Sequence, residues 1–324
     1  MADLEPTGGE TVRCRYCGQL NNVRGEAGQP RCGRCRLVLS GEPHRKFADL
    51  DKYSYIHPLD SRALAALRNI PGIDTALKKL LEVTGESAIR VIFTASAVKV
   101  TPKQCPDLYA KLQVACTTLG VDMPELFVQQ NPIVNAFTGG VKKPVIVLHS
   151  QLIERLNDEE VLAVIAHEVG HIHAEHVLYI TAAKLLELAA TSALRAAPIA
   201  GLITEILSLT MRSALLAWAR RAELSCDRAA LLVTQDPDVI GRTMMKLAGG
   251  TFASRVDYEQ FLVQARDFQK NYDEKALDRF WADIINAGLT HPFPVWRVAE
   301  ILSWVESGEY ARLIRGEAES AAAA

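Results

Sequence analysis

The sequence predicts an α+β fold that is mainly helical, with one small β-sheet and a short cysteine-bearing module in front of it. From Ser61 onward, apolar residues recur mostly at helical spacing. Residues 126–149 differ, because their apolar runs are strand-like and are separated by Asn-Pro and Gly-Gly turn signals. Two Cys-x-x-Cys pairs lie before Ser40. These features predict a helical domain with a single sheet, preceded by a small metal-stabilised ribbon.

The chain has 324 residues, of which 49% are hydrophobic, so it is long enough to bury a substantial core. Its composition changes along the sequence and suggests five segments. The expected boundaries are 1–10 for a flexible tail, 11–40 for the ribbon, 41–60 for a linker, 61–315 for the main domain and 316–324 for a second flexible tail.

Helices are predicted on both sides of the sheet. Before it, apolar residues at helical spacing flank the Pro71-Gly72 break and predict two helices joined by a turn. After it, the expected helices are one beginning at Asn157, a hairpin within 177–219 that turns at 198–201, and segments at 236–247, 258–276 and 296–306.

The formal net charge of −2 excludes a whole-molecule field that would attract nucleic acid or acidic membranes. The polar N-terminus does not resemble a secretion signal, so a cytoplasmic location is expected. Residues 177–219 are strongly apolar, but charged residues interrupt them before the roughly 18 uncharged residues that a membrane span needs. A buried hairpin is therefore expected, and peripheral contact with a membrane is the alternative.

The segment that begins at Asn157 carries the pattern His-Glu-x-x-His. Asn157 and Glu160 form a helix-start signal, so His167 and His171 are expected inside one helix. Four residues advance a helix by slightly more than one turn, and both imidazoles therefore project from one face and can bind one metal ion. Glu168 lies next to them and can reach a water at the metal without being a ligand. The alternative is a chance HEVGH on a solvated helix.

A third ligand distinguishes the classes of His-Glu-x-x-His metallopeptidase. A metzincin needs Gly at position 174 and His at position 177, but the chain has Ala174 and Val177, with His176 one place short. The metzincin class is therefore excluded.

A gluzincin takes a Glu from a later helix, with an Asp four residues further on that orients a histidine ligand. Glu187 has Thr191 at that place, whereas Glu223 and Asp227 have the required spacing within a helical run. Glu223 is thus the expected third ligand and Asp227 its supporting residue. The alternative is that Glu223 is an exposed residue of a charged stretch.

Several motifs resemble the HtpX and CAAX-prenyl-protease (Ste-type) family of integral and soluble zinc peptidases. They are HEVGH at 167–171, ELSCD at 223–227, NAFTGG at 135–140 and THPFPVWR at 290–297. The resemblance covers roughly residues 57–315 and is more specific than HEVGH alone. It implies a zincin-like gluzincin domain.

The resemblance also implies roles for two further segments. Asn135, Ala136, Phe137 and Thr138 would form an edge strand that binds an extended peptide substrate, and an ordinary hairpin is compatible with that use. His291 would stabilise the oxyanion or occupy the open metal position in a resting state. A structural cap before Pro292 is the alternative for His291.

The N-terminal module has the spacing of a structural zinc site with four thiolates. Cys14 and Cys17 form one pair, Cys32 and Cys35 form the other, and fourteen residues separate them. Gly18 and Gly33 are expected to permit the tight turns beside the pairs. A module this short needs the metal in order to fold, and a redox or disulfide pair is the alternative. Its arginines form a basic surface that suits nucleic acid or an acidic protein, and a solvated surface on a purely structural ribbon is the alternative. A protein partner is favoured over nucleic acid.

Together, these patterns predict a zinc-dependent metalloendopeptidase with one catalytic and one structural zinc ion. Its substrate would be a protein or peptide, and its expected role is protein quality control or regulated proteolysis. The alternative is a non-proteolytic binding or regulatory protein that acts through the ribbon on a protein or nucleic-acid partner.

Overall fold

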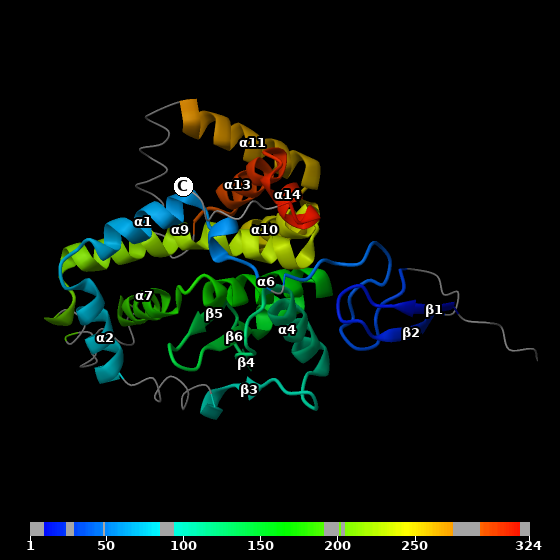
Figure 1. The fold of residues 1–324 in the computed structure, drawn as a ribbon, viewed down its shortest axis with the longest axis horizontal. Coiled ribbons are helices and arrows are strands. Elements are labelled where there is room, and N and C mark those ends of the chain that lie inside the picture. Colours follow the sequence, from blue (N-terminus) through cyan, green and yellow to red (C-terminus); the bar gives the residue numbers. More distant parts are fainter. Residues whose placement is uncertain are drawn as a thin grey trace, which may run out of the picture.

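The computed structural model describes residues 10–23, 29–47, 49–84, 94–190, 201, 205–274 and 292–317. Figure 1 shows that two central helices, α6 (Asp158–His173) and α9 (Leu209–Thr234), divide the fold into two halves. The sheet lies on one side of this pair, and the C-terminal helices lie on the other. The predicted mainly helical α+β fold is thereby confirmed.

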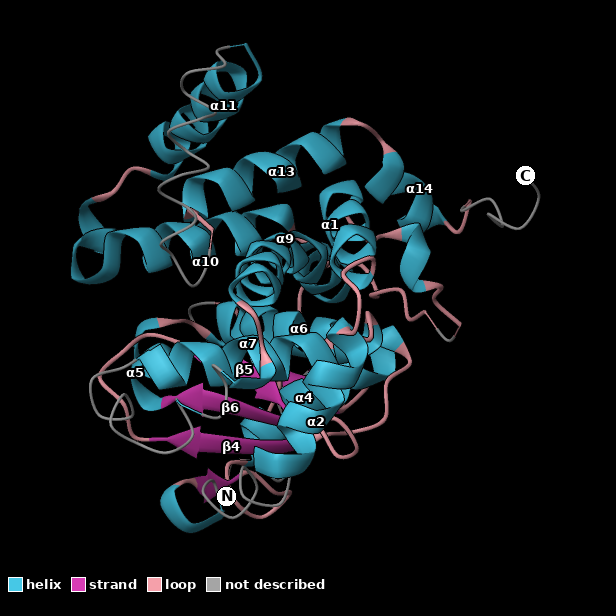
Figure 2. Ribbon diagram, turned by 90° about the vertical axis from the view of Figure 1, so that its left-hand side faces the viewer, coloured by secondary structure: helices cyan, strands magenta, loops and turns pink. Residues whose placement is uncertain are grey.

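The sheet has four strands in the order β3-β4-β6-β5. Their bounds are Val98–Lys99 for β3, Glu125–Gln129 for β4, Ala136–Gly139 for β5 and Val145–His149 for β6. The strand β4 runs parallel to β6, while β3 and β5 pair with their neighbours in the antiparallel sense. Figure 2 shows the sheet covered by helices on one face. The three predicted strands are confirmed, and the two-residue β3 is too short to leave a sequence pattern.

The helix α6 begins as predicted. The Asn157 side chain accepts a hydrogen bond from the Glu160 amide at 2.9 Å, and the Glu160 side chain accepts one from the Asn157 amide at 2.7 Å. Both residues therefore satisfy backbone donors that the first turn leaves unpaired. All residues from Glu159 to His171 are buried, because the sheet, α4 and α9 surround the helix.

The remaining helices frame this centre, and most correspond to predicted segments. They are η1 (Lys52–Ser54), α1 (Pro58–Arg68), α2 (Ile73–Thr84), α4 (Pro106–Leu119), α5 (Ser150–Arg155), α7 (Val177–Ala190), α10 (Pro237–Gly249), η2 (Gly250–Arg255), α11 (Tyr258–Glu274), α13 (Pro294–Glu306) and α14 (Glu309–Arg315). The predicted turn at 198–200 lies outside the described residues. Among the helices described, none combines the length and apolar character that crossing a membrane requires.

The ribbon packs directly against the helical domain. Its strands β1 (Glu10–Arg13) and β2 (Leu20–Val23) form an antiparallel hairpin. Leu37 and Leu39 are buried in the same hydrophobic cluster as residues of α4, α6 and α9. At the start of α6, the Glu159 carboxylate accepts hydrogen bonds from the Val38 amide at 2.8 Å and from Arg31 at 3.1 Å. The ribbon is thus tied to the first turn of the central helix.

The segment that follows the ribbon is also packed. Phe47 and Tyr55 are buried, and the Tyr55 hydroxyl lies 2.7 Å from Nδ1 of His173 on α6. The helix α1 then begins at Pro58, with the side chain of His57 accepting a hydrogen bond from the Leu59 amide. This segment therefore continues the core of the helical domain.

The two central helices pack closely at Gly170. A Cβ atom there would lie 2.8 Å from Cβ of Ala229 and 3.3 Å from Cα of Cys226, both on α9. The absence of a side chain at Gly170 is therefore what allows α9 to approach the metal-binding face of α6.

We predict that Gly170→Ala lowers the free energy of unfolding by about 1–3 kcal/mol, because the added methyl group forces the two helices apart. Gly249→Ala is the matched control, since its new Cβ would meet other atoms only at 3.4 Å or beyond. The control should be neutral or slightly stabilising, because alanine favours helix formation. Urea unfolding of both variants measures the difference, and equal stability would contradict the packing argument.

Candidate metal centre

The structure brings His167, His171 and Glu223 together, as the sequence predicted. Nε2 of His167 lies 3.3 Å from Oε2 of Glu223, and Nε2 of His171 lies 3.3 Å from Oε1 of the same carboxylate. All three side chains are buried. The two imidazoles come from α6 and the carboxylate from α9, so the contact of these helices builds the site.

These distances fit a tetrahedral zinc ion. Zinc lies about 2.0–2.1 Å from nitrogen and oxygen ligands, and tetrahedral angles then separate two ligand atoms by about 3.3 Å. The observed separations agree with this value. In addition, Glu223 and Asp227 contribute two buried carboxylates, whereas Arg297 contributes the single nearby guanidinium. This excess of negative charge stabilises a cation beside Glu223 and the two imidazoles.

Asp227 supports the site from behind. Its Oδ1 lies 3.0 Å from Nδ1 of His167, which orients Nε2 of this imidazole towards Glu223. Arg297 on α13 donates to both oxygens of Asp227, from Nε at 2.7 Å and from Nη2 at 2.5 Å. The sequence predicted Asp227, but it gave Arg297 no role beyond its place at the end of THPFPVWR.

The charges around His167 shift several pKa values. Burial disfavours the charged imidazolium, but the carboxylates of Glu223 and Asp227 outweigh this effect and raise the pKa of His167 to about 9. Burial lowers the pKa of His171. Burial also acts to raise the pKa of Asp227, but the Arg297 guanidinium overcomes it and lowers that pKa below its usual value.

Glu168 lies beside the metal-binding residues and lines a pocket of about 330 Å³. The hydroxyl of Thr138 lies 2.7 Å from Oε2 of Glu168 and 3.0 Å from its backbone carbonyl oxygen, so it can donate to either. Thr138 is itself buried. This contact links the Glu168 carboxylate to the strand β5.

The predicted substrate strand borders the same pocket in part. Asn135 and Ala136 are among the pocket-lining residues, together with His167 and Glu168. Phe137 instead packs edge-on against His149, with ring centroids 6.1 Å apart. Much of the remaining lining is apolar and comes from α6 and α10, through Ala163, Val164, Ile240, Thr243, Met244 and Leu247.

Two further residues near the metal site need comment. His291 lies outside the described residues.

Cys226 forms a cluster of possible metal ligands with His167 and His171, which sequence reasoning did not find. Its Sγ lies 3.8 Å from Nδ1 of His176, which in turn lies 3.4 Å from Nδ1 of His171. Cys226 therefore belongs to the Nδ1 side of the His171 ring, whereas Glu223 faces Nε2.

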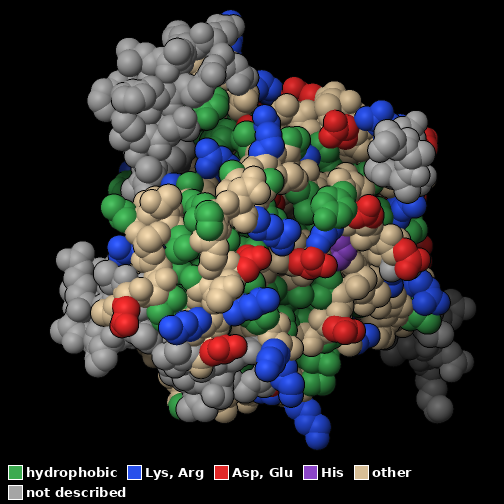
Figure 3. Space-filling model, turned by 60° about the vertical axis from the view of Figure 1, so that its left-hand side comes forward, with side chains coloured by type: hydrophobic (Ala, Val, Ile, Leu, Met, Phe, Trp, Pro, Cys, Tyr) green, Lys and Arg blue, Asp and Glu red, His purple; other side chains and the backbone are tan. Residues whose placement is uncertain are grey.

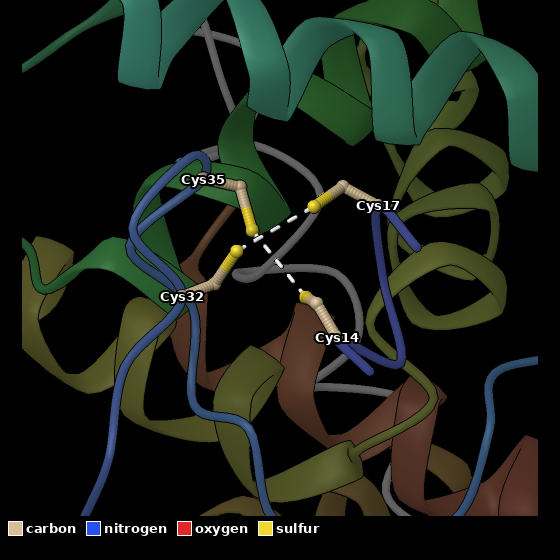
Figure 4. Close-up of side chains that lie close together, drawn as sticks. All are labelled: Cys14, Cys17, Cys32 and Cys35. Atoms are coloured by element: carbon tan, nitrogen blue, oxygen red, sulfur yellow. Dashed lines mark hydrogen bonds between the residues drawn. The ribbon is translucent and has the colours of Figure 1, made fainter. Parts of the chain in front are cut away.

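The four cysteines of the ribbon form a second possible metal site, in which their sulfur atoms point towards one another (Figure 4). The Sγ atoms of Cys14 and Cys35 lie 3.7 Å apart, and those of Cys17 and Cys32 lie 3.6 Å apart. Zinc–sulfur distances of about 2.3 Å in a tetrahedron give a separation of about 3.8 Å. The arrangement fits a zinc ion and is too open for disulfide bonds.

Backbone geometry around the cysteines supports negatively charged sulfur. The Arg34 amide donates to Sγ of Cys32 at 3.4 Å, as a backbone donor beside a thiolate would. The expected turn at Gly18 is confirmed by its φ of 76°.

The expectation for Gly33 is wrong, because it has no positive φ. The second turn places Arg36 in the left-handed region instead, with a φ of 65°. The Gly33 amide donates to the side chain of Asn21 at 2.9 Å, so this residue contributes a contact between the two turns.

The family model for Peptidase family M48 matches residues 102–305, a range that includes both α6 and α9. The chain therefore belongs to this family and is a zinc metallopeptidase related to the HtpX proteases.

Among its relatives is the plastoglobule-localized metallopeptidase 48, chloroplastic, of Arabidopsis thaliana. The two are 37% identical over 295 residues, which cover 89% of this chain and 83% of the relative. The protease HtpX homolog 2 of Methanosarcina mazei is 24% identical over 178 residues, which cover 49% of this chain and 60% of the relative. No solved structure matches the chain significantly.

We predict that Arg297→Met lowers the free energy of unfolding of the metal-free protein by about 3–5 kcal/mol, because the buried Asp227 carboxylate then loses the guanidinium that contacts both of its oxygens. Arg266→Met is the control. Its guanidinium lies 3.5 Å from Glu306 and its side chain is 55% exposed, so the change should cost less than about 1 kcal/mol. Urea unfolding of both variants in the presence of a chelator measures the difference. Equal losses of unfolding free energy would contradict a stabilising role for the buried contact between Arg297 and Asp227.

Proposed function

We propose that the protein is a metalloendopeptidase in which His167, His171 and Glu223 hold zinc and Glu168 activates the attacking water. The observation that supports this most strongly is the ring of ligand atoms, in which both Nε2 atoms lie 3.3 Å from one carboxylate. Glu168 follows His167 in α6 and lines the same pocket.

A zinc ion in such a site supplies Lewis-acid activation of water and of the substrate carbonyl group. The chain contributes the proton transfers. Glu168 accepts a proton from the water as it attacks the scissile carbonyl carbon, and then donates this proton to the leaving amine. The Thr138 hydroxyl donates to the Glu168 carboxylate and so fixes the position of the base relative to the proposed substrate strand β5.

The strand β5 is the proposed binding edge for an extended substrate. It lies at one end of the sheet, where only β6 pairs with it among the described strands. A peptide can add to such an edge through backbone hydrogen bonds. The residues that we assign to this contact are Asn135, Ala136, Phe137 and Thr138.

The pocket suggests which side chains the enzyme accepts. Its lining includes buried apolar side chains, among them Ile240 and Met244. The hydroxyl of Thr243 donates to the Val239 carbonyl oxygen at 2.7 Å, so this hydrogen is not available to donate to a substrate. A wall of this kind favours an apolar substrate side chain next to the scissile bond.

His291 is proposed to stabilise the oxyanion or to occupy the open metal position at rest. Pro292, which follows it in the chain, lines the pocket. This neighbour is what supports a role for His291 at the catalytic centre.

The ribbon is proposed to hold a second, structural zinc ion on Cys14, Cys17, Cys32 and Cys35. A protein partner of the ribbon is proposed over nucleic acid, because the whole chain, with a net charge of −2, has no field that attracts nucleic acid. On the face shown in Figure 3, basic and acidic side chains are interspersed with apolar ones.

We also propose a cytoplasmic location, with which peripheral membrane contact is compatible. The proposed cellular role is protein quality control or regulated proteolysis.

We predict that Glu168→Gln lowers kcat by about 10²–10⁴-fold, because glutamine cannot accept the proton of the water. Zinc content should remain unchanged. Glu259→Gln is a matched control at an exposed position on α11 and should retain full activity. Turnover of a quenched peptide library measures both variants, and normal turnover by zinc-loaded Glu168→Gln would rule out this residue as the base.

We also predict two zinc ions per chain in metal analysis of the purified protein. His167→Ala should remove one of them, and replacing Cys14 and Cys17 together with serine should remove the other. A single ion that persists in the His167→Ala variant would contradict the proposed catalytic site.

A further inference from the structure

The helix α6 ends in a turn that folds the chain back on its metal-binding face. The His176 amide donates to the His171 carbonyl oxygen at 2.9 Å, and the Glu175 amide donates to that of Ile172 at 3.1 Å. These two bonds define a Schellman motif, in which the second residue beyond the helix packs against the third residue from its end. Here that pair is His176 and His171.

The turn requires a left-handed residue, and this chain uses Glu175, with a φ of 59°. A residue other than glycine is strained in this conformation, because its Cβ lies close to the backbone. Such local strain is often found where the surrounding structure constrains a functional group. The group that this turn positions is the imidazole of His176.

His176 connects His171 to a buried carboxylate. Its Nδ1 lies 3.4 Å from Nδ1 of His171, and its Nε2 lies 3.1 Å from Oδ2 of Asp60 on α1. His176 and Asp60 are each only 1% exposed, so water does not replace these contacts.

The neighbours of Asp60 show that it accepts hydrogen bonds. Nε1 of Trp218 donates to Oδ1 at 2.9 Å. Oγ of Ser225 accepts a hydrogen bond from the His57 amide at 3.0 Å, and its own hydroxyl hydrogen points to Oδ2 of Asp60 at 2.6 Å. The Asp60 carboxylate thus presents acceptor oxygens beside His176, whose Nε2 lies within ion-pair distance of Oδ2 although the angle does not meet hydrogen-bond geometry.

This order of donors determines the tautomers of both histidines. The negative charge of Asp60, 3.1 Å from Nε2 of His176, favours a hydrogen on that nitrogen, which leaves Nδ1 of a neutral His176 as an acceptor. Nδ1 of His171 then carries the donated hydrogen, and its Nε2 presents a lone pair on the side where Glu223 lies.

We propose that His176, held by Asp60, is a positioning residue that orients His171 as a zinc ligand. His167 has its carboxylate in direct contact through Asp227, whereas His171 has its carboxylate one imidazole further away. The two ligands are thus supported by separate carboxylates on α9 and α1. This inference rests on the proposed function, in which His171 binds zinc.

The test compares zinc release from three variants of the full-length, zinc-loaded protein. His176→Phe keeps a ring against Trp218 but removes both nitrogen atoms. His176→Asn keeps an amide oxygen near the position of Nδ1. His173→Phe is the control, because this histidine is the last residue of α6, close to His176, and bonds instead to Tyr55 and to the Leu50 carbonyl oxygen.

We expect His176→Phe to release the catalytic zinc to a chelator about 10–100-fold faster than the unchanged protein, because supporting partners of metal ligands have effects of this size. The rate for His176→Asn should lie close to that of the unchanged protein, and His173→Phe should leave the rate unaltered. Ribbon zinc serves as an internal reference whose release rate stays constant. A purely structural role for His176 would instead change both rates together.

Kinetics provide a second readout. His176→Phe should lower kcat of the zinc-loaded enzyme and leave KM nearly unchanged, because His176 does not line the substrate pocket. If this variant does not fold, Asp60→Asn takes its place, since it removes the charge at constant volume and should also accelerate catalytic zinc release.

Unaltered catalytic zinc release in His176→Phe, or in Asp60→Asn where His176→Phe does not fold, would overturn the positioning role. Failure of the proposed function gives a different result, since His171→Ala would then retain the catalytic zinc.

Discussion

The close contact between α6 and α9 is the constraint on which the rest of the structure depends. Gly170 lets the backbone of α9 approach until Ala229 and Cys226 touch α6. Only this proximity places the Glu223 carboxylate 3.3 Å from both imidazoles and Asp227 3.0 Å from the back of His167. A metal site built from two helices is as precise as their packing, because a shift of one ångström would separate the ligands beyond the reach of one ion.

Around this contact, each end of α6 is held by other parts of the chain. At its start, the ribbon binds Glu159 through Val38 and Arg31. At its end, the turn at Glu175 returns His176 to the metal-binding face. In this chain, the ribbon thus packs into the core of the protease domain. Its hydrogen bonds to Glu159 offset the cost of burying that carboxylate. Zinc in the ribbon would therefore stabilise the helix that carries His167, Glu168 and His171.

Much of the centre could be predicted because its signals are local. The four-residue spacings within HEVGH and ELSCD place side chains on one helix face, and the capping box at Asn157 and Glu160 marks where α6 begins. The contacts of Arg297 with Asp227 and of Asp60 with His176 join residues far apart in sequence, and periodicity carries no information about such pairs. The docking of the ribbon was missed for the same reason. The second turn of the ribbon shows a different limit, since Arg36 adopts a conformation that glycine usually provides.

The location of the catalytic metal tests the central claim most directly. Anomalous X-ray diffraction at the zinc edge, on crystals of the zinc-loaded protein, would reveal it. The expected peak lies about 2.0–2.2 Å from Nε2 of His167, Nε2 of His171 and a carboxylate oxygen of Glu223. A peak bonded to Sγ of Cys226 in place of Glu223, or none between α6 and α9, would contradict the account.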